Sequence, residues 1–192
     1  VTRLMTERPQ VTKERTSYTF WPGTETVPFS VAPRVLNRPH SITADVEIPA
    51  GGAEGVLLCQ GANTGGYTFY VRDQRLHYAH NYLSRAIYRV SSPDPLPEGR
   101  HRLRFEFEPT GKPDFSTGLG APGRAQLYVD EQLVADADLP VTVPVLLAPG
   151  GLSCGANLGA PVDPEYAVPF RFTGVLHQVT VDLSGDLITD SE

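Results

Sequence analysis

The 192-residue sequence is poor in sulfur, with two cysteines, Cys59 and Cys154, and one methionine, Met5. A small disulfide scaffold would be far denser in cysteine, and no Cys-x-x-Cys or cysteine–histidine spacing typical of zinc is present. We therefore expect the two cysteines to be small apolar side chains in or near the core, with a single long-range disulfide between them as the alternative.

A long hydrophobic run and an excess of positive charge are also lacking. No apolar stretch approaches the ~20 residues that a bilayer-spanning helix needs. Lysine and arginine number 16 against 22 acidic residues, so the formal net charge is −6. Nucleic acids and anionic membranes attract a basic face, so we expect neither nucleic acid nor a membrane as a partner.

The patterns that are present are those of strands. Apolar residues alternate with polar ones over residues 42–48, and Leu103, Phe105 and Phe107 alternate with charged residues over 101–108. No window has helical periodicity, and the 18 glycines and 18 prolines fall between the patterned segments. Roughly ten to twelve short strands are typical of an all-β, antiparallel β-sandwich of the jelly-roll kind.

Turn residues and segment lengths predict the organisation of the domain. The pairs Asp73-Gln74 and Asp130-Glu131 each join two strands as a tight hairpin. The last strand is expected at 172–183, with Val175, His177, Val179 and Val181 on one face. We expect a linker or docking arm at 1–16, one sandwich domain at 17–185 with a long loop at 109–123, and a tail at 186–192.

Catalytic and metal-binding patterns are weak. Glu106 and Glu108 project from one side of a strand, but the arginines on that side favour an ordinary solvent-facing row over a glycosidase pair. His77 and His80, three apart on a strand, point to opposite faces and cannot share a metal without a bulge. Acids in loops, such as Asp163 and Glu165, leave calcium open on composition alone, although no contiguous oxygen-ligand loop is present. We expect no catalytic residue and no cofactor in this chain.

Tyrosines are better placed to bind a ligand. Four of them fall on three consecutive predicted strands: Tyr70, Tyr78, Tyr82 and Tyr88. An exposed row of tyrosines could stack on sugar rings, whereas the alternative is ordinary packing in the core and at its edges.

Six segments, taken in order and spacing, resemble the C-terminal region of large bacterial arylsulfatases. They are RTSYTF at 15–20, SITADVEIP at 41–49, GGAEGVL at 51–57, GGYTFYV at 65–71, PLPEGRH at 95–101 and VPFRFTG at 168–174. The resemblance extends from about Arg15 to Leu183. It implies a concanavalin A/laminin-G-like sandwich appended to an α/β catalytic domain that hydrolyses sulfate esters.

The resemblance also implies what the parent enzyme needs: a formylglycine made within a C/S-x-P-x-R motif, and a divalent cation, usually calcium. Both belong to the catalytic domain. The string at 30–34, SVAPR, has its proline and arginine adjacent and is not that motif. Asn157 stands where relatives tend to have an acid, which weakens any expectation of a cation there.

These observations predict a non-catalytic C-terminal domain of a sulfuric ester hydrolase, inactive alone. It would pack on the catalytic domain of the same polypeptide, shape substrate access or make homo-oligomer contacts. We expect contacts from the arm at 1–16 and from the 109–123 loop, including Lys112 and Phe115. The alternative is a lectin-like module that binds a glycan on the tyrosines, and a third reading is a glycosidase built on Glu106 and Glu108.

Overall fold

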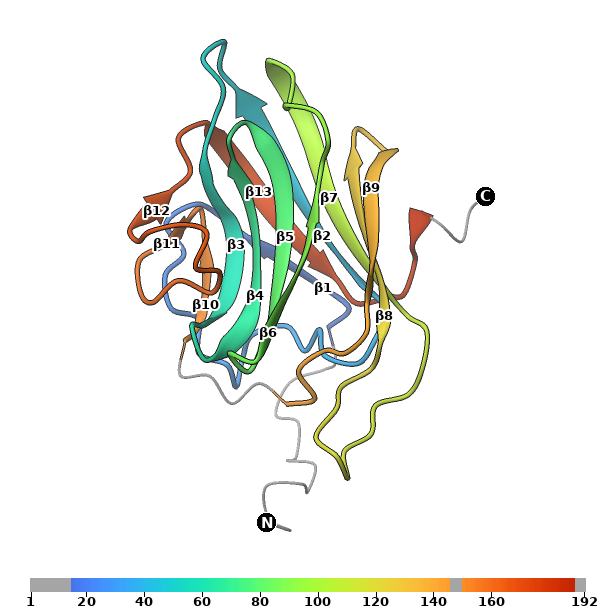
Figure 1. Cartoon of the computed structure of the whole chain (residues 1–192). Coiled ribbons are helices and arrows are strands. Elements are labelled where there is room, and N and C mark those ends of the chain that lie inside the picture. Colours follow the sequence, from blue (N-terminus) through green and yellow to red (C-terminus); the bar gives the residue numbers. More distant parts are fainter. Residues whose placement is uncertain (1–14, 146–149, 189–192) are drawn as a thin grey trace.

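A computed structural model describes residues 15–145 and 150–188 as two β-sheets packed face to face (Figure 1). Sheet A has, in spatial order, β1 (Ser17–Phe20), β13 (Val175–Asp182), β2 (His40–Ile48), β7 (Gly99–Pro109), β8 (Gly123–Val129) and β9 (Gln132–Leu139). Sheet B has β11 (Ala156–Asn157), β12 (Phe170–Arg171), β3 (Gly55–Ala62), β4 (Gly65–Arg72), β5 (Arg75–Tyr82) and β6 (Ala86–Ser91), with β10 (Leu152–Cys154) also paired to β3. The predicted all-β, antiparallel sandwich is confirmed; the exception is one parallel pairing of Arg171 with Val56.

The core lies between the inner faces of the two sheets. On β2 the predicted alternation is confirmed, since Ile42, Ala44 and Val46 are fully buried. Tyr78 of sheet B stacks on Phe105 of sheet A, with ring centroids 3.6 Å apart. Within the described residues, no helix is long and apolar enough to cross a membrane.

Two predicted hairpins owe their tight turns to backbone with positive φ. Asp73 and Gln74 have φ of 50° and 61°, and Asp130 and Glu131 have φ of 49° and 71°. Two consecutive residues with positive φ define the type I′ turn, whose twist matches that of the flanking strands. Sequence and structure agree here because two-residue hairpins leave few alternatives.

The last strand corrects two predictions. Its register against β2 shifts between Leu176 and Gln178, so Leu176 and Val179 are buried whereas Val175 and His177 lie outside. The prediction of one shared face was therefore wrong for the first half of the strand, because a β-bulge inverts the alternation. The strand also begins at Val175 rather than at 172.

The two cysteines lie on opposite faces of sheet B and are free. Cys59 is the register partner of Ser153, and Cys154 is the partner of Leu58. Side chains alternate along each strand, so Cys59 and Cys154 point apart and form no disulfide. Burial raises the pKa of each thiol to about 12, so both stay protonated and inert near neutral pH.

The two ends of the chain were expected to be an arm and a tail. Most of the arm, residues 1–14, and the last four residues, 189–192, lie outside the described ranges. Leu187 is buried, and the Ile188 amide donates to Glu106 of β7 at 2.8 Å. The described part of the tail therefore packs on the outer face of sheet A.

Candidate functional site

The four tyrosines form no exposed row. Tyr70, Tyr78 and Tyr82 are 2%, 3% and 8% exposed, and Tyr88 is half-buried. Register places Tyr78, Tyr82 and Tyr88 on the inner face of sheet B, whereas Tyr70 points to the outer face. Of the two interpretations of these tyrosines, packing in the core and at its edges is therefore the one that the structure has, rather than a stacking platform.

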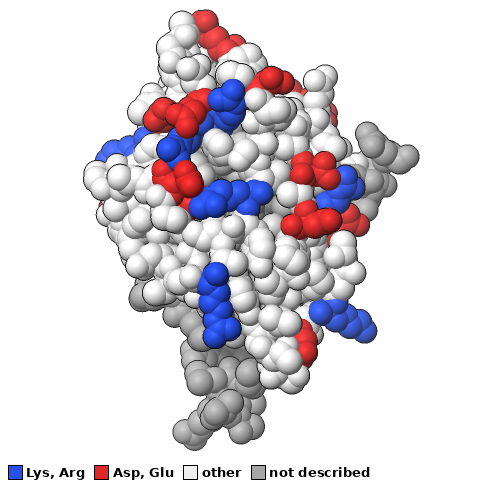
Figure 2. Space-filling view, viewed as in Figure 1, with Lys and Arg blue, Asp and Glu red and all other residues white. Residues whose placement is uncertain are grey.

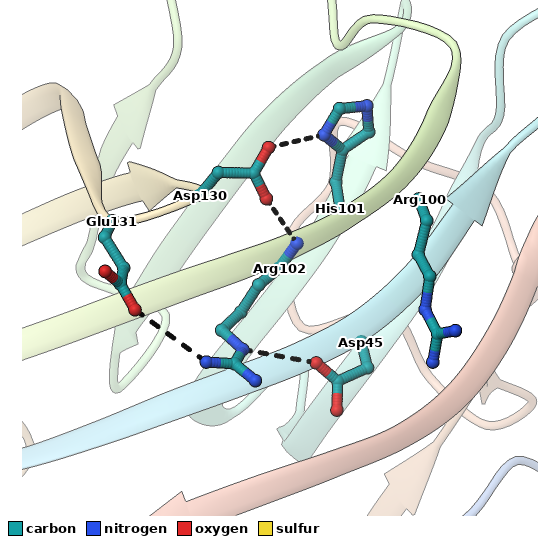
Figure 3. A pocket seen from close by; sticks show the side chains of 6 residues that line it. All are labelled: Asp45, Arg100, His101, Arg102, Asp130 and Glu131. Atoms are coloured by element: carbon teal, nitrogen blue, oxygen red, sulfur yellow. Dashed lines mark hydrogen bonds and ion pairs between the residues drawn. The ribbon is translucent and has the colours of Figure 1, made fainter.

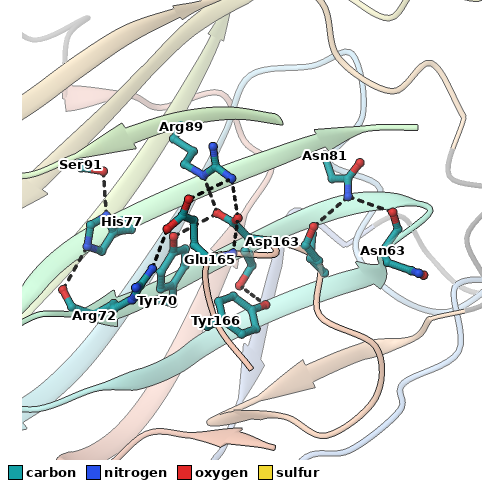
Figure 4. Close-up of polar contacts among 12 residues, drawn as sticks. Asn63, Tyr70, Arg72, His77, Asn81, Arg89, Ser91, Asp163, Glu165 and Tyr166 are labelled. Carbon is teal, nitrogen blue, oxygen red and sulfur yellow. Dashed lines mark hydrogen bonds and ion pairs between the residues drawn. The ribbon is translucent and has the colours of Figure 1, made fainter. Parts of the chain in front are cut away.

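Tyr70 is buried on an outer face because the 158–169 segment covers sheet B (Figure 4). The pin of this cover is Asp163, which accepts two hydrogen bonds from the Arg89 guanidinium at 2.7 and 2.8 Å and one from the Tyr70 hydroxyl at 3.0 Å. Burial alone would raise the pKa of Asp163, but the bonds from Arg89 and from the Glu165 amide hold it below its ordinary value.

The bonds around Asp163 also bear on the calcium alternative. Both carboxylate oxygens of Asp163 already accept hydrogen bonds from Arg89, so they do not fit a cation ligand. No group of three or more histidine, cysteine or acidic side chains suited to a metal occurs among the described residues. Asn157 donates to the Tyr166 hydroxyl at 2.9 Å and holds the same cover in place.

Glu106 corrects a second prediction, because its side chain is 0% exposed rather than solvent-facing. Its Oε1 accepts hydrogen bonds from Arg104 Nε at 2.7 Å and from the Ile188 amide at 2.8 Å. The C-terminal segment thus covers a carboxylate 82 positions earlier in the chain. A buried, doubly bonded Glu106 does not fit the solvent-accessible carboxylate pair that the glycosidase reading needs.

A polar hollow of about 420 Å³ opens on the outer face of sheet A (Figure 3). Six residues line it: Asp45, Arg100, His101, Arg102, Asp130 and Glu131. Asp130 accepts from the Arg102 amide at 2.8 Å and from His101 at 2.7 Å, while Arg102 also pairs with Asp45. Partial burial alone would raise the pKa of Asp130, but these hydrogen bonds hold it below its ordinary value.

Arg100 differs from the other residues that line this hollow. Its guanidinium makes no hydrogen bond or ion pair with any described residue, whereas Arg102 has acidic partners (Figure 3). In the sequence, these alternating charges indicate a solvated strand face. The hollow itself arises where β2 and β7 meet the β8–β9 turn, which the sequence pattern alone does not reveal.

A second surface is apolar. Phe115, Leu119 and Val145 are 56%, 41% and 44% exposed. Phe115 and Leu119 lie in the 109–123 loop, as does the exposed Lys112, so both predicted contact residues of this loop are accessible. We call the surface formed by the 109–123 loop and residues 144–145 the apolar end.

Hydrogen bonds hold the 109–123 loop in a defined shape. Asp114 and Leu119 exchange two backbone hydrogen bonds of 2.8 and 2.9 Å, and the Asp114 carboxylate accepts from the backbone and hydroxyl of Ser116. The Tyr82 hydroxyl donates to the Gly118 carbonyl at 3.1 Å, which ties the loop to β5.

The rest of the apolar end is held by a second set of bonds. Asn37 accepts from the Ala121 amide at 2.8 Å and donates to the Pro144 carbonyl at 3.0 Å. Thr142 accepts from the Gly120 amide and donates to the Ala121 carbonyl. The exposed apolar side chains therefore project from an ordered frame, in which the loop and residues 142–144 lie side by side.

The charged surface offers no comparable feature on the face toward the viewer in Figure 1. Acidic and basic side chains interleave there rather than forming a patch of one sign (Figure 2). Arg72, for example, pairs with both Asp73 and Glu165. Exposed ion pairs of this kind contribute little to the stability of a protein and little to the recognition of a partner.

Comparison with solved structures defines the class of fold. Domains LG4–5 of the mouse laminin α1 chain match with a TM-score of 0.59 at 13% identity, over 88% of this chain and 39% of that one. The botulinum neurotoxin serotype C1 binding domain matches with a TM-score of 0.50 at 7% identity, over 80% and 35%. A SAP-like pentraxin from Limulus polyphemus has a TM-score of 0.49 at 12% identity, over 91% and 81%.

The chain thus has a laminin-G-like β-sandwich fold, as the resemblance implied. It spans less than half of the laminin chain that it matches. No protein-family model and no curated protein sequence matches it. At these identities the likeness shows the fold alone, so function must be argued from the two surfaces described above.

Proposed function

We propose that this chain is a non-catalytic domain that works by binding, and that its partner is a sulfatase catalytic domain of the same polypeptide. The apolar end is the surface that docks. The observation that carries this proposal is the exposure of Phe115 and Leu119 on a hydrogen-bonded loop. Large apolar side chains held outward on an ordered frame are typical of protein–protein contacts, because docking removes them from water at little cost in conformational entropy.

The choice of partner rests on the six segments that resemble the C-terminal region of arylsulfatases. In this proposal the calcium ion and the formylglycine belong to the catalytic domain. Two observations support this assignment: the oxygens of Asp163 accept hydrogen bonds from Arg89, and residues 30–34 lack the spacing of the formylglycine motif. The sandwich contributes a rigid surface that borders and shapes the substrate entrance.

The test begins with the coding sequence upstream of Val1. We expect a sulfatase-length segment with a C/S-x-P-x-R motif. That segment, produced separately, should bind this chain saturably with 1:1 stoichiometry in a calorimetric titration. An upstream sequence without the motif, or no heat of binding, would contradict the proposal. Self-association of the chain alone through the same surface would also contradict it, since the apolar end would then serve a homo-oligomer.

A lectin-like role remains the second candidate, moved from the tyrosines to the polar hollow. The observation in its favour is Arg100, whose donors face the hollow without a partner among the described residues. Sugar hydroxyls and carboxylates could accept those bonds. Wild-type chain should then bind a member of a panel of neutral and acidic oligosaccharides. Arg100→Ala should abolish that binding and Lys112→Ala should not; no binding by wild-type chain would end this candidate.

A further inference from the structure

Two histidines are buried in the core beside the apolar end. His40 on β2 and His80 on β5 are 4% and 3% exposed and come from opposite sheets. Both line a cavity of about 10 Å³, together with Tyr67, Tyr78 and Phe107. A cavity of this size holds about one water molecule.

The hydrogen bonds fix the state of His80. The Val143 amide donates to His80 Nε2 at 2.9 Å, so this nitrogen must carry a lone pair and no proton. An imidazolium has a proton on each nitrogen and cannot accept this bond. The attachment of residues 142–144 to the sandwich therefore depends on a neutral His80.

His40 is in a similar position. Its Nδ1 lies 3.0 Å from the Arg38 carbonyl, which only accepts, so Nδ1 carries the proton. Its Nε2 is buried and has no hydrogen-bond partner. A proton placed on Nε2 would be a buried charge with nothing to accept it, unless the core opened.

The groups around the two rings offer no compensating negative charge. The titratable groups that face them from the neighbouring strands are tyrosines: Tyr67 on β4, Tyr78 and Tyr82 on β5 and Tyr88 on β6. Phe105 and Phe107 of β7 pack on His40, and the nearby charge is the Arg38 guanidinium, which disfavours protonation. Glu106 lies on β7 between those two phenylalanines and points to the opposite face of sheet A.

We propose that His80 and His40 form an acid-sensitive latch, in which protonation of His80 breaks its bond with Val143 and releases residues 140–145 from the sandwich. The 109–123 loop would lose its support at the same time. Thr142 bonds to Gly120 and Ala121 of the loop, and Asn37 joins Ala121 to Pro144. Mild acid would thereby dismantle the apolar end while the two sheets stay paired.

The expected size of the pH effect follows from the pKa of His80 in the closed state and in the released state. In the closed state, burial lowers the pKa of His80 from 6.5 to about 4, and the positive charge that His40 would carry lowers it in the same direction. In the released state the ring is solvated and regains an ordinary value of about 6.5. The ratio of released to closed segment should therefore rise about 20-fold between pH 7 and pH 5.

Hydrogen exchange at the Val143 amide tests the latch directly and needs no docking partner, so its outcome is independent of the proposed function. After correction for intrinsic exchange, the protection factor of Val143 should fall about 20-fold from pH 7 to pH 5. The amide of Thr68, in the middle of β4, should open only with global unfolding, so its protection factor should stay well above that of Val143 at both pH values. His80→Gln should keep a bond to Val143, because the glutamine oxygen accepts without titrating, and should abolish the pH dependence.

His177→Gln is the matched control, because His177 lies at the surface and contacts Glu47 rather than the core. It should leave the pH dependence of Val143 unchanged. The latch is contradicted if Val143 protection is independent of pH, or if His80→Gln retains the pH dependence. Equal protection factors at Thr68 and Val143 at pH 5 would also overturn it, because both amides would then exchange through global unfolding rather than local release.

Discussion

The segments at 158–169 and 109–123 are both long connections that lie against the sandwich, but they are held in different ways. The 158–169 segment is pinned by a carboxylate, Asp163, which receives bonds from Arg89, Tyr70 and the Glu165 amide. The 109–123 loop is held by uncharged groups, through the Tyr82 hydroxyl and the side chains of residues such as Asn37. The first hides an aromatic cluster, whereas the second exposes Phe115 and Leu119.

This difference separates a structural cover from a binding surface. A buried carboxylate with every oxygen bonded fixes the 158–169 segment, because opening it would strand a charge in an apolar setting. The loop at the apolar end can move away from its neutral partners at a much smaller cost, about 1 kcal/mol for each hydrogen bond. We therefore expect perturbations to affect the apolar end first and the 158–169 cover last.

The largest expected effect is that of acid on global stability. The pKa of His40 and of His80 is lowered to about 4 by burial, against an ordinary 6.5. Between these values the unfolded chain binds protons that the folded chain does not. Stability should therefore fall as the pH drops from about 6.5 to about 4 and level off below, by on the order of 3 kcal/mol for each histidine.

Urea denaturation at a series of pH values measures this loss. Wild-type protein should show a clear fall between pH 7 and pH 5, a range in which Asp163, with its lowered pKa, stays ionised and contributes no change. The double variant His40→Gln, His80→Gln should fall much less over the same range, and the fall that is left is expected from His77, whose pKa is also lowered by burial. A flat wild-type profile would show that the buried histidines are not held neutral.

The next largest expected effect is the loss of stability when the Asp163 contacts that hold the 158–169 segment are removed. Asp163→Ala should destabilise the protein by about 3 kcal/mol, because it leaves the buried Tyr70 hydroxyl and the Arg89 guanidinium without their acceptor. The exposed Glu165 is the control, since Glu165→Gln should cost about 0–1 kcal/mol. Equal losses in the two variants would mean that the Asp163 contacts are not what secures the cover.

The smallest change concerns the attachment of the 109–123 loop. Tyr82→Phe removes the hydroxyl that donates to the Gly118 carbonyl and should cost about 1 kcal/mol. Amide exchange should quicken at Leu119 and Gly120 and stay unchanged at Tyr166 in the other connection. Faster exchange at both places would show that the two connections are coupled rather than independent.

Local patterns in the sequence predicted much of the frame. Alternation placed Ile42, Ala44 and Val46 inside, and the Asp-Gln and Asp-Glu pairs marked two hairpins correctly. Each of these features depends on neighbours within a few residues. Face and turn are then determined by side-chain period and backbone geometry alone.

Features created by distant segments could not be predicted. Glu106 looked solvent-facing because nothing near it in sequence shows that Ile188 and its neighbours cross the same strand. The burial of Tyr70 on an outer face could not be predicted, because the 158–169 segment that covers it lies some 90 positions later. The bulge at Leu176 is a third case, since it is a property of the pairing between β13 and β2.

The candidate site was partly predictable, because some of its residues are neighbours in the sequence whereas others meet only in the fold. A long loop rich in glycine and proline indicated the 109–123 segment, and Lys112 and Phe115 within it are exposed. Asn37 and Thr142 bond to that loop only through tertiary contacts. No periodic pattern in the sequence connects these residues.

The most direct test of the docking role is a titration of the separately produced upstream segment with three forms of this chain. Phe115→Ser should weaken binding about tenfold or more without changing stability, because the exposed ring matters only when it is buried in the complex. Leu133 is an apolar residue of similar exposure on β9, 47% against 56% for Phe115, and lies outside the apolar end, so Leu133→Ser should bind as the wild type does. Wild-type affinity in Phe115→Ser, or an equal loss in Leu133→Ser, would contradict docking through the apolar end.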